Sequence, residues 1–157
     1  MKNTLILFMA FAFSITLFAQ TNNDEIELLQ TIYGMEKKAV VAGFIKIDEA
    51  KKEAFWALYD SYEAERKSQG KAYIKILQRY VEKYDNLNDE NAATLMKDNL
   101  KHRKQTEKLL AKYYKQFTKL VGAKQAAQFF QLESYFLNIN RVQLMETIPF
   151  IGELDEK

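Results

Sequence analysis

A row of seven lysines is the most distinctive set of chemically active side chains in this sequence. Successive members are separated by steps of 4, 3, 4, 4, 3 and 4 residues, and they are Lys97, Lys101, Lys104, Lys108, Lys112, Lys115 and Lys119. These steps place all seven ammonium groups on one stripe of a helix, about 33 Å long. Only Asp98 and Glu107 oppose them in the same stretch. This lysine row could bind acidic or partly unfolded polypeptide, or it could be a solvated face screened by water, salt and acidic neighbours.

Aromatic side chains form a second candidate binding set, because several fall beside the apolar faces of the predicted helices and not on them. They are Trp56, Tyr59, Tyr114 and Tyr135. Amphipathic rings at the edge of an apolar stripe suit adaptable contacts with many partners, and they suit a dimer interface equally well. The first three of these residues, together with the lysine row, are the predicted partner-binding residues.

The residues needed for catalysis or metal binding are missing. The chain has no cysteine and a single histidine, His102, which lies between two cationic residues and is a poor metal ligand there. The serines at Ser61, Ser68 and Ser134 fall inside predicted helices, with no neighbouring base and no oxyanion donor. We therefore predict a protein that is not an enzyme and that binds neither a cofactor nor a metal.

The first nineteen residues have the three-part pattern of a secretory signal peptide. Lys2 gives a positive start, residues 4–18 contain no charge, and Ala19 is a small residue where the apolar run stops. The run is shorter than the roughly 20 residues that a membrane-spanning helix needs. No cysteine lies near the cleavage point, which excludes a lipid anchor there. The expected location is the periplasm, with cleavage near Ala19, no membrane span afterwards and no nucleic acid as a partner.

The rest of the chain has the length of one domain and a balanced charge. Removing the segment that contains Lys2 lowers the 23 basic residues to 22, against 21 acidic residues. Five glycines and one proline are too few for the turns of a many-stranded sheet. We predict a single helical domain at residues 24–150 and a C-terminal tail at 151–157.

Hydrophobic periodicity and helix-terminus signals predict four helices, and the fold class is therefore all-α. Their approximate ranges are 24–44, 48–85, 88–121 and 123–148. Asp48 and Asn88 are expected N-caps, Gly122 ends the third helix, and Pro149 stops the fourth. Two of the helices would be about 50 Å long, which favours an elongated shape.

A turn of only about three residues, 85–87, joins the two longest helices, so they must form an antiparallel hairpin. A symmetrical turn pairs residue i with roughly residue 173 minus i, which places Leu100 opposite Tyr73 and Glu107 opposite Arg66. Polar residues interrupt the apolar faces of both helices near Arg66. We interpret them as a polar layer that fixes the register, with Arg66 and Glu107 as a candidate ion pair.

Three of the predicted helices begin with a related pattern: an apolar residue, a capping or small residue, two further residues, and a long polar side chain. The three copies lie at 47–51, 87–91 and 121–125. The stretch 121–133 resembles the LTxxQ motif of the Spy and CpxP family, with Val121 in place of the leucine, Gly122 in place of the threonine, and Gln125 matching. The copy at 47–51 keeps neither the threonine nor the glutamine.

The resemblance to the Spy and CpxP family implies both a fold and a function. Members are exported, and long helices form a cradle-shaped dimer. The implied function is that of an ATP-independent periplasmic chaperone that binds unfolded or misfolded envelope proteins. The alternative is an envelope-stress signalling adaptor that docks on a sensor protein. Either role makes a homodimer the expected assembly.

Two features near the C-terminus carry structural expectations. Glu133 and Asn140 fall near the apolar face of the last helix, so we expect them to have buried partners. The tail carries apolar residues at Phe150, Ile151 and Leu154. Such a strip would not be left in water without reason, and it should fold back on the core or reach a second subunit.

Overall fold

The computed structural model describes residues 34–153. The predicted signal peptide at 1–19, its cleavage point near Ala19, residues 24–33 of the first predicted helix and Leu154 of the tail lie outside the described residues. The chain divides into two compact units, 1–40 and 41–157. Every contact discussed below lies within the second unit.

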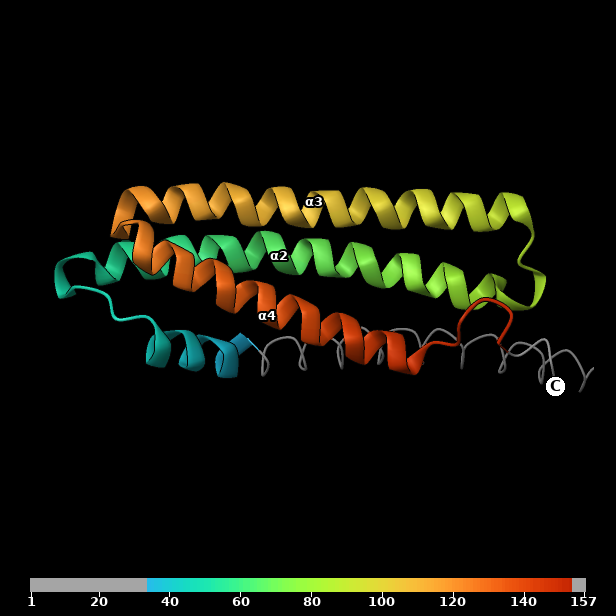
Figure 1. Cartoon of the computed structure of the whole chain (residues 1–157), viewed down its shortest axis with the longest axis horizontal. Helices are drawn as coiled ribbons and strands as arrows, with labels where there is room; N and C mark the ends of the chain where they lie inside the picture. The colour runs from blue at the N-terminus through green and yellow to red at the C-terminus, as the bar shows by residue number, and fades with distance from the viewer. Residues whose placement is uncertain (1–33, 154–157) are drawn as a thin grey trace, which may run out of the picture. The chain divides into compact units, whose positions relative to one another are not determined.

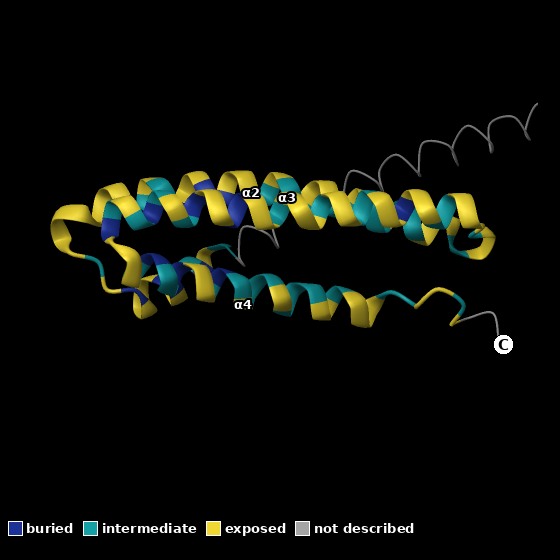
Figure 2. Ribbon diagram, turned by 45° about the horizontal axis from the view of Figure 1, so that its top comes forward, coloured by how far each residue is buried: buried dark blue, intermediate teal, exposed yellow. Residues whose placement is uncertain are grey.

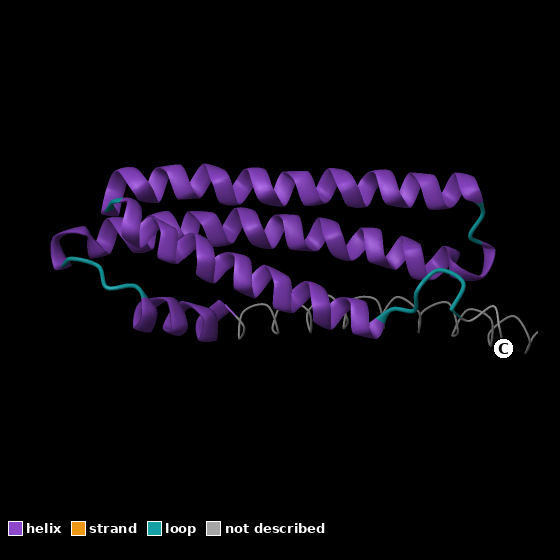
Figure 3. Ribbon diagram, in the orientation of Figure 1, coloured by secondary structure: helices purple, strands orange, loops and turns teal. Residues whose placement is uncertain are grey.

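The described residues are helical, and they contain no strand (Figure 3). After a helical stretch at 34–44 come α2 (Glu49–Lys83), a short 3-10 turn η1 (Tyr84–Asn86), α3 (Asp89–Val121) and α4 (Ala123–Thr147). Helices α2, α3 and α4 pack antiparallel in succession (Figure 1). The predicted all-α class and the long antiparallel hairpin are confirmed. None of the described helices is long and apolar enough to cross a membrane.

The helix boundaries follow local signals in the sequence. At the start of α3, the Asn88 side chain accepts a hydrogen bond of 2.9 Å from the Asn91 amide. At its end, Gly122 has φ +93°, a conformation that few other residues adopt. Asp48 occupies the N-cap position of α2, but its side chain makes no capping hydrogen bond. Its backbone carbonyl accepts the Lys51 amide at 2.9 Å instead, so the boundary was predicted correctly and the capping contact was not.

The three helices bury an aromatic core near the junction of α3 and α4. Phe55, Phe117 and Phe129, one from each helix, are completely buried. The Phe117 and Phe129 ring centroids are 4.2 Å apart, and those of Phe55 and Phe117 are 5.0 Å apart. Figure 2 shows the buried residues concentrated in this part of the bundle, which we call the packed end. The opposite end, next to η1, we call the open end.

The register of the hairpin agrees with the prediction to within about one helical turn. The rings of Tyr73 and His102 stack with centroids 4.8 Å apart, where the prediction placed Leu100 opposite Tyr73. The predicted ion pair between Arg66 and Glu107 is wrong. Arg66 instead donates two hydrogen bonds of 2.9 Å to Glu63, one turn earlier on the same helix, while Glu107 is exposed.

Candidate functional site

The lysine row lies on the outer side of α3, as predicted. All seven side chains are exposed. At 100° per residue, the row is on the opposite side of the helix from the buried residues Leu95, Tyr113 and Phe117. Among the described residues, only Lys112 of the row forms an ion pair. The other six ammonium groups are therefore available to a partner.

Lys112 belongs to a small network that joins α2 to α3. Its ammonium group donates to both carboxylate oxygens of Glu65, at 2.6 and 2.9 Å, and lies 4.9 Å from the centre of the Tyr113 ring. The Tyr113 hydroxyl donates to the same carboxylate at 2.7 Å. Hydrogen bonds from Lys112 and Tyr113 lower the pKa of Glu65. Burial, followed by the bond to Glu65, raises the pKa of Tyr113 to about 12.

The three predicted aromatic contact residues have different environments. Trp56 is half-buried and packs edge-on against Phe55 with centroids 5.1 Å apart. Tyr114 is also half-buried, and it packs edge-on against Phe130 of α4 at 5.7 Å. Tyr59 is only 1% exposed, so its predicted position beside the apolar face is wrong. The physical reason is that α2 packs against both α3 and α4, and its buried stripe is therefore wider than one neighbour would require.

A buried hydrogen bond joins α2 to α4 at the inner limit of the packed end. The Tyr62 hydroxyl donates to Glu133 at 2.7 Å, and Glu133 is completely buried. Burial raises the pKa of Tyr62, and the neighbouring Glu133 carboxylate raises it further. The expected buried partner of Glu133 is confirmed. A polar layer does cross the bundle here, but through Tyr62 and Glu133 and not through Glu107.

The outer side of α4 lacks charge over much of its length. Between residues 125 and 140 the only charged residue is the buried Glu133. The side chains exposed on this stretch include Phe130 at 37% and Tyr135 at 60%. Interface cores are depleted of charged residues and enriched in aromatic ones. The lack of charged residues in this stretch is visible in the sequence. Assigning helix faces by hydrophobicity alone did not identify it.

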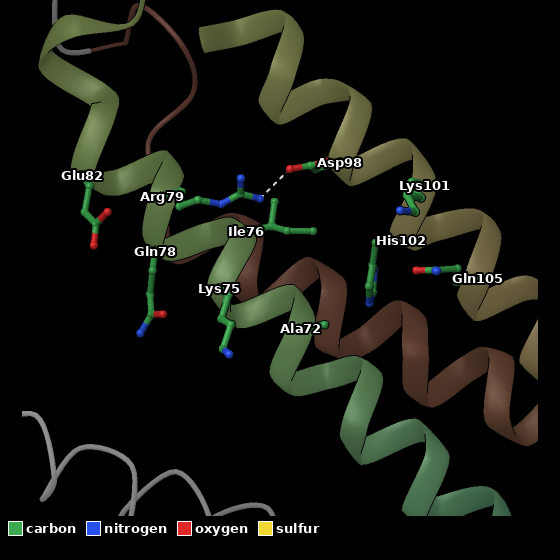
Figure 4. A pocket seen from close by; sticks show the side chains of 10 residues that line it. All are labelled: Ala72, Lys75, Ile76, Gln78, Arg79, Glu82, Asp98, Lys101, His102 and Gln105. Atoms are coloured by element: carbon green, nitrogen blue, oxygen red, sulfur yellow. Dashed lines mark hydrogen bonds and ion pairs between the residues drawn. The ribbon is translucent and has the colours of Figure 1, made fainter.

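A depression also lies on the surface of the hairpin. It lies between α2 and α3, where Arg79 forms a 2.6 Å ion pair with Asp98 (Figure 4). His102 reaches it with its ring, and the ring nitrogen Nε2 is 3.0 Å from the Gln69 carbonyl oxygen. Burial lowers the pKa of His102. In the described part of the chain, no group of three or more acidic or histidine residues is placed to hold a metal ion.

A second cavity lies at the open end, and sequence reasoning missed it. Its volume is about 440 Å³, and it is bordered by the ends of α2, α3 and α4 and by the residues after α4. Most of its wall is apolar, with side chains that include Leu77, Tyr80, Met96, Leu144 and Ile148. Periodicity assigns these residues to apolar faces, but it does not show whether the facing side chains fill the space between them.

The segment after α4 covers the far end of the cavity and is tied to α2 by its backbone. The Tyr80 hydroxyl donates to the Pro149 carbonyl at 2.7 Å, and the Tyr84 hydroxyl donates to the Phe150 carbonyl at 2.8 Å. The predicted folding back therefore occurs for the backbone. The side chains of Phe150 and Ile151 nevertheless remain 64% and 62% exposed.

Comparison with known proteins gives no match. No family model, no curated protein and no solved structure matches this chain.

Proposed function

We propose that this protein is a Spy/CpxP-like, ATP-independent chaperone of the periplasm, which binds unfolded or misfolded envelope proteins through the outer faces of its long helices. The proposal combines the resemblance in the helix-start motifs with the surface chemistry described above. The observation that carries it is the stretch 125–140 of α4, which has no charged residue except the buried Glu133 and in which Phe130 and Tyr135 are exposed.

An uncharged aromatic surface suits unfolded polypeptide because it offers apolar area without requiring one fixed arrangement of partners. Tyrosine and phenylalanine rings provide large contact area with little loss of rotamer entropy. A folded partner would need complementary shape along the whole face, whereas an unfolded chain can adapt to it. The stretch 125–140 of α4 is therefore the proposed site for apolar client segments.

The lysine row contributes the second part of the proposed surface. Six ammonium groups form no ion pair with the described part of the chain. On a stripe about 33 Å long, they attract acidic chain segments and accelerate their encounter with the protein. This attraction weakens with salt, because the screening length is about 8 Å at physiological ionic strength. The apolar contacts on α4 do not weaken in the same way. The two faces therefore predict different salt dependences.

The test is suppression of the aggregation of a denatured client, measured by light scattering at low and high salt. We expect suppression at equimolar protein without nucleotide. The triple variant Lys104→Glu, Lys108→Glu and Lys115→Glu should suppress less at low salt and like wild type at high salt. A control with the same charge change outside the row is Lys46→Glu, Lys51→Glu and Lys124→Glu, which should suppress like wild type under both conditions.

Two results would count against the proposal. Absence of suppression under all conditions would contradict the chaperone role, and equal loss in both triple variants would contradict a specific role for the lysine row. A single saturable envelope partner without any suppression would favour the adaptor function. The expected homodimer is tested on the same samples by light scattering coupled to size-exclusion chromatography.

A further inference from the structure

The charged side chains that line the cavity at the open end are all positive. The charged residues in its wall are Arg66, Arg103 and Arg141, and none of the described residues that line it is an aspartate or a glutamate. Arg66 donates two hydrogen bonds to the Glu63 carboxylate, which neutralises its charge. No described residue forms an ion pair or a hydrogen bond with Arg103 or Arg141. Two positive charges in the wall are thus uncompensated.

These two arginines lie at the same level of the bundle. Along α4, Arg141 is about halfway between Glu133, which is bonded to Tyr62, and Pro149, which is bonded to Tyr80, so it lies near Tyr73 of α2. Arg103 follows His102 in α3, and the His102 ring stacks on Tyr73. After the larger effect of burial, the charge of Arg141 also lowers the pKa of His102, which agrees with their proximity.

Further hydrogen-bonding capacity lies at this level. Gln69, which also lines the cavity, has a buried side-chain oxygen with no hydrogen-bond partner among the described residues. Rotating the amide by half a turn would present its NH₂ group at the same place. Gly70 adds space, because a Cβ atom built there would meet no atom within 4 Å. The level of the two arginines is therefore cationic, polar and unfilled.

Beyond this level, toward η1, the wall becomes apolar. From Gly70 to Lys83, the last residue of α2, the distance is about 20 Å along the helix axis. Leu77, Met96, Leu144 and Ile148 line this part of the cavity. The total volume of about 440 Å³ is within the usual range of roughly 300 to 1,000 Å³ for small-molecule sites. The cavity thus has a cationic inner end and a long apolar outer part.

We propose that this cavity binds a single-chain amphiphile with an anionic head group, such as a long-chain carboxylate. Arg103 and Arg141 bind the head, and the acyl chain extends between α2, α3 and α4 toward the backbone of Pro149 and Phe150. Charge complementarity selects this occupant over a neutral apolar molecule. An anionic head group can accept charge-assisted hydrogen bonds from two arginines that have no acidic partner among the described residues.

This site is separate from the surfaces proposed for polypeptide. On α3, the residues that line the cavity are on the side of the helix opposite the lysine row. Loss of aggregation suppression and loss of amphiphile binding can therefore occur independently. The proposed function and this inference can each fail without the other.

The test is calorimetric titration of the purified protein with dodecanoate, with dodecanol and with a lysophospholipid that has the same chain and an anionic phosphodiester head, each below its micelle concentration. We expect one saturable site per chain that binds dodecanoate at least about tenfold more tightly than dodecanol, which corresponds to about 1.4 kcal/mol. Binding of the lysophospholipid would also support the anionic subsite, and its affinity relative to dodecanoate identifies the preferred head group.

The double variant Arg103→Gln and Arg141→Gln should lose this preference while it still binds dodecanol as wild type does. Arg79→Gln removes a cation from the outer side of the same hairpin, and it is the matched control that should keep the preference. Leu144→Trp fills the apolar part of the cavity and should abolish binding of every probe, with circular dichroism confirming that each variant is folded. Equal affinity for dodecanoate and dodecanol, an unchanged preference in the double arginine variant, or no saturable binding of either anion would overturn the proposal.

Discussion

The packed end and the open end are built from the same three helices, but they are filled very differently. At the packed end, Phe55, Phe117 and Phe129 are completely buried against one another. At the open end, Leu95 is the one described residue of the hairpin that is classed as buried, and about 440 Å³ remains between the helices. Figure 2 shows the same contrast along the bundle. The comparison indicates that the packed end fixes the fold, and the open end is where we propose that a ligand binds.

Side-chain chemistry explains the difference. Aromatic rings from three helices meet at the packed end, and each ring covers the others with a large apolar area. At the level of Arg103 and Arg141, the wall changes to cationic and polar groups that cannot be closely packed without partners. The buried bond between Tyr62 and Glu133 marks the boundary between the two regions. The predictions below test this division, from the largest expected effect to the smallest.

Truncating the packed end should cost the most stability. Phe129→Ala removes a ring that contacts Tyr59, Tyr62 and Phe117, and we expect it to lower the free energy of unfolding by about 3–5 kcal/mol. The measurement is urea denaturation followed by circular dichroism. Phe150→Ala is the control at the open end, where the ring is 64% exposed, and it should change stability by less than about 0.5 kcal/mol. Equal losses in the two variants would contradict the division.

Removing the boundary hydrogen bond should have a smaller effect. Tyr62→Phe leaves a fully buried Glu133 carboxylate without its Tyr62 donor, and it should cost about 1–3 kcal/mol in the same assay. Tyr80→Phe also removes one hydroxyl, but the Pro149 carbonyl that it contacts is only partly buried. We expect a clearly smaller loss there. If Tyr80→Phe lowered the free energy of unfolding more than Tyr62→Phe, the contact with the segment after α4 would stabilise the position of α4 more than the Tyr62–Glu133 hydrogen bond does.

High pH should destabilise the protein through Tyr113. Its pKa is raised in the folded state from 10.0 to about 12, so the stabilisation is complete below pH 10 and is lost as the pH rises to 12. Urea midpoints measured across this interval should fall more steeply in wild type than in Tyr113→Phe, which has no phenol to ionise. Other groups titrate in both proteins and cancel in the comparison. Parallel curves would contradict the coupling of Tyr113 to Glu65.

The smallest effect is expected at the glycine beside the cavity. Gly70 lies within α2, and a Cβ atom there meets nothing within 4 Å, so Gly70→Ala should stabilise the protein by up to about 1 kcal/mol. Gly122→Ala should do the opposite, because Gly122 has φ +93° and alanine is strained in that conformation. Thermal melts of the two variants should therefore shift in opposite directions. A shift in the same direction would indicate that the space beside Gly70 is not open.

Much of the fold could be predicted from the sequence, because its signals are local. Asn88, Gly122 and Pro149 placed the helix ends, and the short turn after Lys83 required an antiparallel hairpin. The exposed lysine row also followed from spacing alone. The partner of Arg66 could not be predicted, since a glutamate one turn away competes with a glutamate on the facing helix, and only the side-chain geometry decides between them.

The candidate sites were harder to predict, because they depend on how the third helix packs. Tyr59 is buried since α4 covers a side of α2 that the hairpin alone would leave exposed. The cavity depends on the same packing, since Arg103 and Arg141 are 38 residues apart in sequence and line one cavity only when α4 lies against the hairpin. Periodicity identifies a face, but it does not show whether that face is filled.

Native-state hydrogen exchange tests the division of the molecule most directly. Backbone amides of α3 around Leu110, Tyr113 and Phe117, and those of α4 around Phe129, should exchange only with global unfolding. Amides near the end of α4, from Leu137 to Thr147, should exchange through local opening at a clearly lower free energy. Uniform protection along the whole of α4 would contradict the account, because both ends would then belong to one equally packed core.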